Sequence, residues 1–138
     1  MVVANYKIED VEGIGPVIGA KLRDAGVSNT DQLLANAKTP AQRQALSEAS
    51  GLSEDRVLKF ANMCDLYRIG GVGSEFAELL EAAGVDTVPE LAQRNAENLS
   101  KRMAKLNQEM DLTRHVPLES QVTRWVEQAK ILPRMLEY

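Results

Sequence analysis

The sequence predicts an all-α fold, and three observations support this prediction. Apolar residues recur at helical spacing, and no segment alternates apolar and polar residues over a useful length, so we expect no sheet. Hydrophobic residues make up 44% of the chain but aromatic residues only 4%, so aliphatic side chains and alanines must fill closely packed helices. A glycine-bracketed turn that opens a helix occurs twice, at residues 11–22 and 69–80, with a constant offset of 58 residues (71 − 13).

The first copy of this turn organises the first half of the chain. Residues 7–12 can form about one helical turn, and Ile14 then lies between Gly13 and Gly15 as an apolar plug. Pro16 opens the following helix and Gly26 ends it, because proline suits a first helical turn and glycine a helix end. The predicted apolar stripe of this helix consists of Val17, Ile18, Leu22 and Ala25.

Three more helices complete the first half. Asn29 with Gln32 is a capping-box pattern for a helix to about residue 37, and Thr39 with Gln42 repeats it for a helix to about residue 49. Ser53 can cap a longer helix that runs toward residue 69. Its predicted inward side chains are Val57, Phe60, Ala61 and Cys64.

The second half repeats this order. Residues 80 and 83–85 match residues 22 and 25–27, Thr87 with Glu90 repeats the capping box, and Asn95 can cap the next helix. A polar loop at residues 111–117 precedes a final helix, which Pro133 should end. The predicted inward side chains of these last two helices are Leu99, Met103, Leu106, Val122, Trp125, Val126 and Ala129.

We therefore predict a single compact domain over residues 1–138, built from two pseudo-repeated halves around one shared core. The first repeat covers about residues 7–66, the second about residues 67–132, and residues 133–138 form a C-terminal tail. Residues 1–6 are expected to be a frayed arm.

Composition narrows the functional classes. The net charge of −4 and a pI near 5.1 mean that any nucleic-acid binding must be local. Cys64 and His115 are the only cysteine and histidine, so we expect no disulfide, no metal and no cofactor, with Cys64 a small buried side chain. No apolar segment is long enough to span a bilayer, so we expect a soluble, cytoplasmic protein without a membrane or small-molecule partner.

Both glycine turns lead into a helix and then into an Ala-Gly-Val stop, and in this they resemble helix-hairpin-helix domains. The structural hairpins are Gly13, Ile14, Gly15 and Gly71, Val72, Gly73. Residues 76–87 and 89–95 are similar to a bacterial family of tandem helix-hairpin-helix proteins of unknown function, and the resemblance covers about residues 8–132. It implies the fold and assigns no activity.

The broader helix-hairpin-helix class implies a phosphate site at a hairpin. There, backbone N–H groups and a helix N-terminus hold a phosphate of the nucleic-acid backbone without reading sequence. In this chain Gly13 and Gly15 would supply the N–H groups, with Lys21 and Arg23 nearby. A second candidate is the basic group Lys101, Arg102 and Lys105, followed in the loop by Arg114 and His115, for which a solvated helix face is the alternative.

Other residues argue against such a site. Val17 and Ile18 stand where a binding hairpin usually offers polar groups, and Glu75 opens the second helix, where a carboxylate repels phosphate. Glu9, Asp10 and Glu12 precede the first turn and can cancel its positive charge.

Two functions stay open. One is weak, sequence-independent binding of DNA or RNA through the first hairpin, and the other is protein interaction or self-association by a fold that has lost its phosphate contacts. An enzyme is not expected, because no nucleophile motif, metal-ligand spacing or phosphate loop occurs.

Overall fold

The computed structural model describes residues 5–138, and the described chain is all-helical, as predicted. The one β-type contact within it is an isolated bridge between Lys7 and Asn29. A 3-10 helix, η1 (Ile8–Asp10), precedes the α-helices α1 (Gly15–Asp24), α2 (Thr30–Ala35), α3 (Pro40–Ser50), α4 (Glu54–Leu66), α5 (Ser74–Ala82), α6 (Val88–Ala92), α7 (Ala96–Met110) and α8 (Glu119–Ile131).

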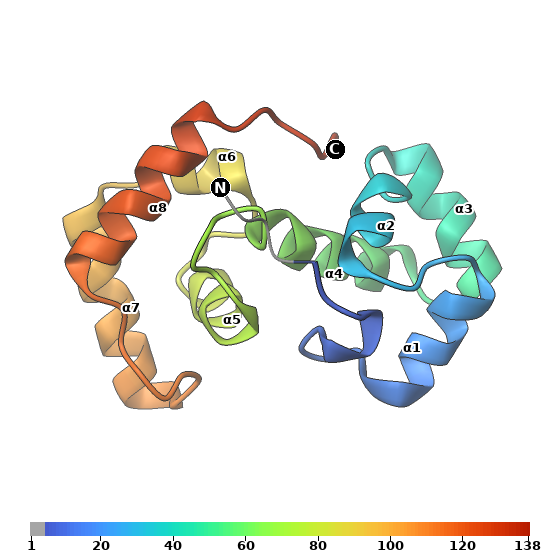
Figure 1. Ribbon diagram of the computed structural model, residues 1–138, viewed down its shortest axis with the longest axis horizontal. Coiled ribbons are helices and arrows are strands. Elements are labelled where there is room, and N and C mark those ends of the chain that lie inside the picture. The colour runs from blue at the N-terminus through green and yellow to red at the C-terminus, as the bar shows by residue number, and fades with distance from the viewer. Residues whose placement is uncertain (1–4) are drawn as a thin grey trace. The chain divides into compact units, whose positions relative to one another are not determined.

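The chain divides into two compact units. The first unit comprises Asn5–Asp65 together with Arg134–Tyr138, and the second comprises Leu66–Pro133. Within the first unit α1 packs against η1 and α3; within the second, α8 packs against α6 and α7, and α7 against α5 (Figure 1). Each glycine turn therefore belongs to its own unit. The single domain with a shared core stays a prediction.

The N-terminal arm is partly anchored. Residues 1–4 of the predicted frayed arm lie outside the described residues. Tyr6 exchanges two hydrogen bonds of 3.0 Å with Thr30, and the Asn5 side chain accepts from the Asp31 N–H at 3.2 Å. These bonds tie the arm to the first turn of α2, so the prediction of fraying is wrong for residues 5 and 6.

The predicted N-caps are mostly confirmed. Thr39 and Gln42 form a complete capping box, and the side chains of Asn29, Ser53 and Asn95 each accept from a backbone N–H three residues on. The box predicted for Asn29 is only half formed, because the Gln32 side chain accepts from the Ser28 N–H instead. At the start of α6, however, the buried Thr87 hydroxyl donates to the Glu90 carboxylate at 3.3 Å and accepts nothing from the helix backbone. The capping box predicted for Thr87 is therefore wrong, since the Glu90 carboxylate accepts from the Thr87 hydroxyl and, at 3.4 Å, from the Asp86 N–H instead of from the Thr87 N–H.

The glycine stops of α1 and α5 have the same geometry. Gly26 and Gly84 have φ of +92° and +89°, and the next residue donates to a carbonyl five positions back: Val27 to Leu22 at 2.8 Å, and Val85 to Leu80 at 2.9 Å. This bond is typical of the left-handed helix ending that glycine permits. Proline also acts as predicted, since α8 ends at Ile131, before Pro133.

The predicted cores are largely confirmed. Ile14, Val72, Phe60, Cys64 and Trp125 are all buried. The stripe predicted for α1 is confirmed at Leu22, which is fully buried, and wrong at Val17, which is 72% exposed; Gly19 is buried as well. Leu22 lies five positions after Val17 in the helix, which places the two residues about 140° apart around the axis.

The C-terminal tail is docked within the first unit. Leu136 is buried, and the main chain of Glu137 donates to the Lys38 carbonyl at 2.7 Å and accepts from the Arg43 guanidinium at 2.6 Å. The Tyr138 hydroxyl donates to the Asn62 side chain at 3.0 Å. Residues 134–138 are thus part of the packed structure of this unit.

Candidate functional site

The first hairpin is a tight turn that leads directly into α1. Gly13 and Gly15 have φ of +87° and +65°, a conformation that side chains disfavour, and the Ile14 N–H donates to the Val11 carbonyl at 3.0 Å. Pro16 has no N–H. In the first turn of α1, the N–H groups of Gly15 and Val17 donate to no described residue. These two groups can therefore donate to an anion.

The two basic side chains beside this hairpin have different surroundings. Lys21 is exposed on α1. Arg23 is held by Glu9 in a two-pronged ion pair, with Nε to Oε2 at 2.5 Å and Nη2 to Oε1 at 2.6 Å. Gly13, Gly15, Lys21 and Arg23 all belong to the first unit, and the Arg23 charge is neutralised by Glu9.

Gly19 makes this ion pair possible. A Cβ atom at Gly19 would lie 2.7 Å from Cγ of Glu9, closer than side-chain atoms pack. The glycine therefore lets the Glu9 side chain cross α1 to reach Arg23. Of the three acids that precede the turn in sequence, Glu9 is paired with Arg23.

The ion pair changes the protonation of Glu9. Hydrogen bonding from Arg23, followed by a backbone hydrogen bond, lowers the pKa of the Glu9 carboxyl from its ordinary value of 4.5 to about 2. The same bond raises the pKa of Arg23. Both groups therefore stay charged together at all but very acidic pH.

This shift predicts acid sensitivity. Because the folded pKa lies below the unfolded value, the contribution of Glu9 to stability is complete above pH 4.5 and is lost as the pH falls toward 2. We expect the melting temperature of Glu9→Gln to lie below that of the unmodified protein at pH 6, and the difference to shrink by pH 2. Thermal melts across this range test it, with Glu48→Gln on α3 as the charge-matched control. A difference that does not depend on pH would contradict the pairing.

The second hairpin differs from the first. Gly71 has a φ of +92°, but Gly73 is extended at −99°, so the second hairpin has one left-handed glycine where the first has two. The Val72 N–H donates to the Ile69 carbonyl at 3.1 Å. Glu75 is half-exposed at the start of α5, where its charge disfavours an anion.

The basic group on α7 is a solvent-facing surface. Lys101, Arg102 and Lys105 are all exposed, and Lys101 forms an exposed ion pair with Glu97 at 3.0 Å, one helical turn earlier. Such pairs add little stability. These three residues belong to the second unit, whereas the candidate residues of the first hairpin belong to the first.

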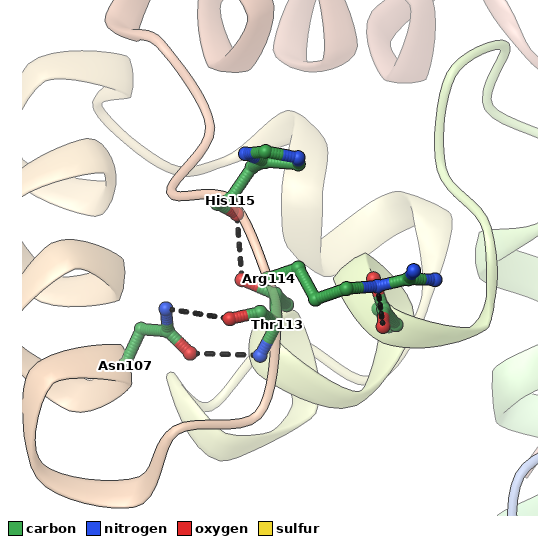
Figure 2. Close-up of polar contacts among 5 residues, drawn as sticks. Asn107, Thr113, Arg114 and His115 are labelled. Atoms are coloured by element: carbon green, nitrogen blue, oxygen red, sulfur yellow. Dashed lines mark hydrogen bonds and ion pairs between the residues drawn. The ribbon is translucent and has the colours of Figure 1, made fainter.

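The loop between α7 and α8 is built around Asn107, whose role sequence reasoning missed. Its buried side chain accepts from the Thr113 N–H at 2.8 Å and donates to the Thr113 carbonyl at 3.2 Å, and the Thr113 hydroxyl donates to the His115 carbonyl at 2.6 Å (Figure 2). Arg114 donates to Glu75 at 3.4 Å. The Arg114 charge is thus shared with a carboxylate rather than added to the α7 group.

The single cysteine of the chain lies in the core of the first unit. Cys64 is 3% exposed, and burial, followed by the charges of Asp65 and Asp31, raises the pKa of its thiol. Within residues 5–138 no three His, Cys, Asp or Glu side chains gather to hold a metal ion. None of the described helices is both long and apolar enough to cross a membrane.

The fold and its two hairpins define a small all-helical protein with a glycine turn at the start of two of its helices. Residues 12–132 match the family described as "Domain of unknown function (DUF4332)", and the chain belongs to this family. No curated protein and no solved structure matches the chain.

Proposed function

We propose that the protein is a non-catalytic helix-hairpin-helix module that contacts the phosphate backbone of DNA or RNA through its first hairpin, weakly and without sequence preference. The observation that carries this proposal is the turn with two left-handed glycines, which leaves the N–H groups of Gly15 and Val17 at the N-terminus of α1. Unpaired N–H groups and the helix dipole favour an anion there. Lys21, exposed further along α1, supplies the positive side chain.

The Glu9–Arg23 pair limits the strength of this binding. Arg23 already donates two hydrogen bonds to Glu9, so a phosphate must compete with a carboxylate for the guanidinium. With a net charge of −4, the protein also repels a polyanion at long range. Weak binding follows from both facts.

Titrations of labelled nucleic acid test the proposal. We expect fluorescence anisotropy to show binding of single-stranded and duplex DNA and RNA at low salt, and Lys21→Glu to weaken it about tenfold and to reduce the salt slope by about one unit. Glu9→Gln, which frees Arg23, should strengthen binding.

Two charge-matched variants control these measurements. Lys59→Glu changes an exposed lysine on α4, and Glu48→Gln an exposed glutamate on α3, both in the first unit. If Lys59→Glu weakens nucleic-acid binding as much as Lys21→Glu does, the effect is one of overall charge. The first hairpin is then not the binding site. No binding at about 50 µM protein would reject nucleic acid as the partner.

A second function is favoured by one observation. Val17 is 72% exposed, and its neighbours Pro16 and Ala20 are exposed with it, so the start of α1 presents apolar atoms where a phosphate site usually has polar ones. This surface suits a protein partner or a second copy of the chain. In that case sedimentation shows association that depends on protein concentration and is lost in Val17→Glu, while the nucleic-acid titrations stay flat.

A further inference from the structure

A small cavity lies between the second hairpin and α8, within the second unit. It has a volume of about 160 Å³. Its lining residues are Gly70, Gly71, Gln121, Arg124, Trp125 and Gln128. None of these six carries a carboxylate, and Arg124 gives the lining a positive charge.

The indole of Trp125 is fixed with its N–H toward the hairpin. Trp125 is 2% exposed, and its ring packs against Phe76 with centroids 5.2 Å apart and an interplanar angle of 52°. Its Nε1 lies 3.2 Å from the position of a Cβ atom at Gly71. Gly71 therefore keeps the space in front of the indole N–H open.

No hydrogen bond joins this N–H to a described residue, and since no buried side-chain nitrogen or oxygen of the described residues lacks a partner, the N–H reaches solvent at the cavity. An indole N–H that reaches solvent donates to water, and an oxygen atom of an anion can take the place of that water. A donor that faces a cavity and lacks a protein acceptor is suited to an acceptor from outside the chain.

Two other polar side chains of the cavity, Gln121 and Arg124, have donors that are not used. Gln128 closes two hydrogen bonds with the main chain of Gly70, at 2.9 and 3.4 Å. The oxygen of the Gln121 side chain accepts from the Leu118 N–H at 2.8 Å, which leaves its NH₂ group. Arg124 donates through Nε to the Ser120 carbonyl at 3.4 Å, which leaves its two Nη groups.

From this donor set we propose that the cavity binds one small oxyanion, a carboxylate or a phosphate, between the Trp125 indole N–H and the Arg124 guanidinium. Guanidinium groups pair with both kinds of oxyanion through two parallel hydrogen bonds. The site lies in the second unit and uses none of the residues proposed for nucleic-acid contact at the first hairpin. It therefore stands or falls independently of that proposal.

The single tryptophan of the chain makes the test direct. Sodium phosphate and sodium acetate are titrated separately into the full chain at constant ionic strength, with sodium chloride as the reference salt, and the NMR signal of the indole N–H is followed. We expect one of the two anions to give a saturable shift, with a Kd of about 1 mM. The anion that saturates identifies the oxyanion chemistry.

Two variants on α8 show whether the shift comes from the cavity. Arg124→Gln removes the charged donor and should weaken binding at least tenfold, whereas Lys130→Gln removes an exposed charge outside the lining and should leave it unchanged. Arg124 is itself exposed, so its substitution is not expected to unfold the protein. A drift no different from that of chloride, or an Arg124→Gln titration identical to that of the unmodified chain, would overturn the proposal.

Discussion

Replacing Arg43 with methionine is expected to lower the free energy of unfolding of the first unit by about 3 kcal/mol. Arg43 is only 6% exposed, and its guanidinium donates to three backbone carbonyls: Ala37 at 2.9 Å, Lys38 at 3.2 Å and Glu137 at 2.6 Å. Methionine fills a similar volume but donates to none of them. The free energy of unfolding falls because these three carbonyls lose their charged donor.

The same substitution should loosen the C-terminal tail. Arg43 holds the Glu137 carbonyl, and its guanidinium also lies 5.7 Å from the centre of the Tyr138 ring, within range of a cation–π contact. We expect residues 134–138 of Arg43→Met to be cleaved faster in limited proteolysis, and urea unfolding to show the loss of stability.

Arg56→Met is the matched control for Arg43→Met, because Arg56 is exposed on α4 in the same unit. It should change stability by less than about 0.5 kcal/mol. If both variants unfold at the same urea concentration as the unmodified protein, the buried guanidinium does not hold this unit together.

We expect the free energy of unfolding to fall by about 2–5 kcal/mol in each of the variants Leu22→Ala and Leu80→Ala, which is the range for truncating a packed leucine. Both leucines are fully buried, and each lies in the last turns of its helix, where its carbonyl accepts the bond that follows the glycine stop. Both substitutions remove the same number of methyl and methylene groups. How far the surrounding side chains can collapse into each site decides where its cost lies in that range.

These two variants also test the sequence prediction of a single domain. If the halves share one core, each substitution moves a single unfolding transition, measured by circular dichroism in urea. Two separate transitions, of which each variant moves only one, would contradict that prediction. Leu118→Ala, at a leucine that is 67% exposed, is the control and should leave the midpoint almost unchanged.

Helices and their ends were well predicted because they depend on neighbouring residues. The glycine after α1 and that after α5, the proline after α8 and the cap of α3 each act within a few positions of their own helix. The error at Val17 came from assigning a stripe without knowing which side of α1 faces the rest of the unit. Periodicity gives the spacing of a stripe, but packing determines its direction.

The candidate site was predicted less completely, because its charges are paired across distant parts of the chain. Glu9 is 14 residues from Arg23 in sequence and Glu75 is 39 from Arg114, and no local pattern links either pair. The role of Asn107 had only a weak signal, an amide next to the apolar stripe of α7. Hydrogen bonding to Thr113 gave it a function in shaping the loop.

The sequence by itself determined the all-helical class, the positions of the helices and the two glycine turns, since backbone hydrogen bonds within a helix and glycine conformations are local properties. Only the tertiary structure decided that Glu9 neutralises Arg23, that the tail docks on Arg43, and that the buried Trp125 turns its N–H to a cavity. Those outcomes depend on which side chains folding brings together. Distances of this kind are set by packing, and packing is a property of the folded chain.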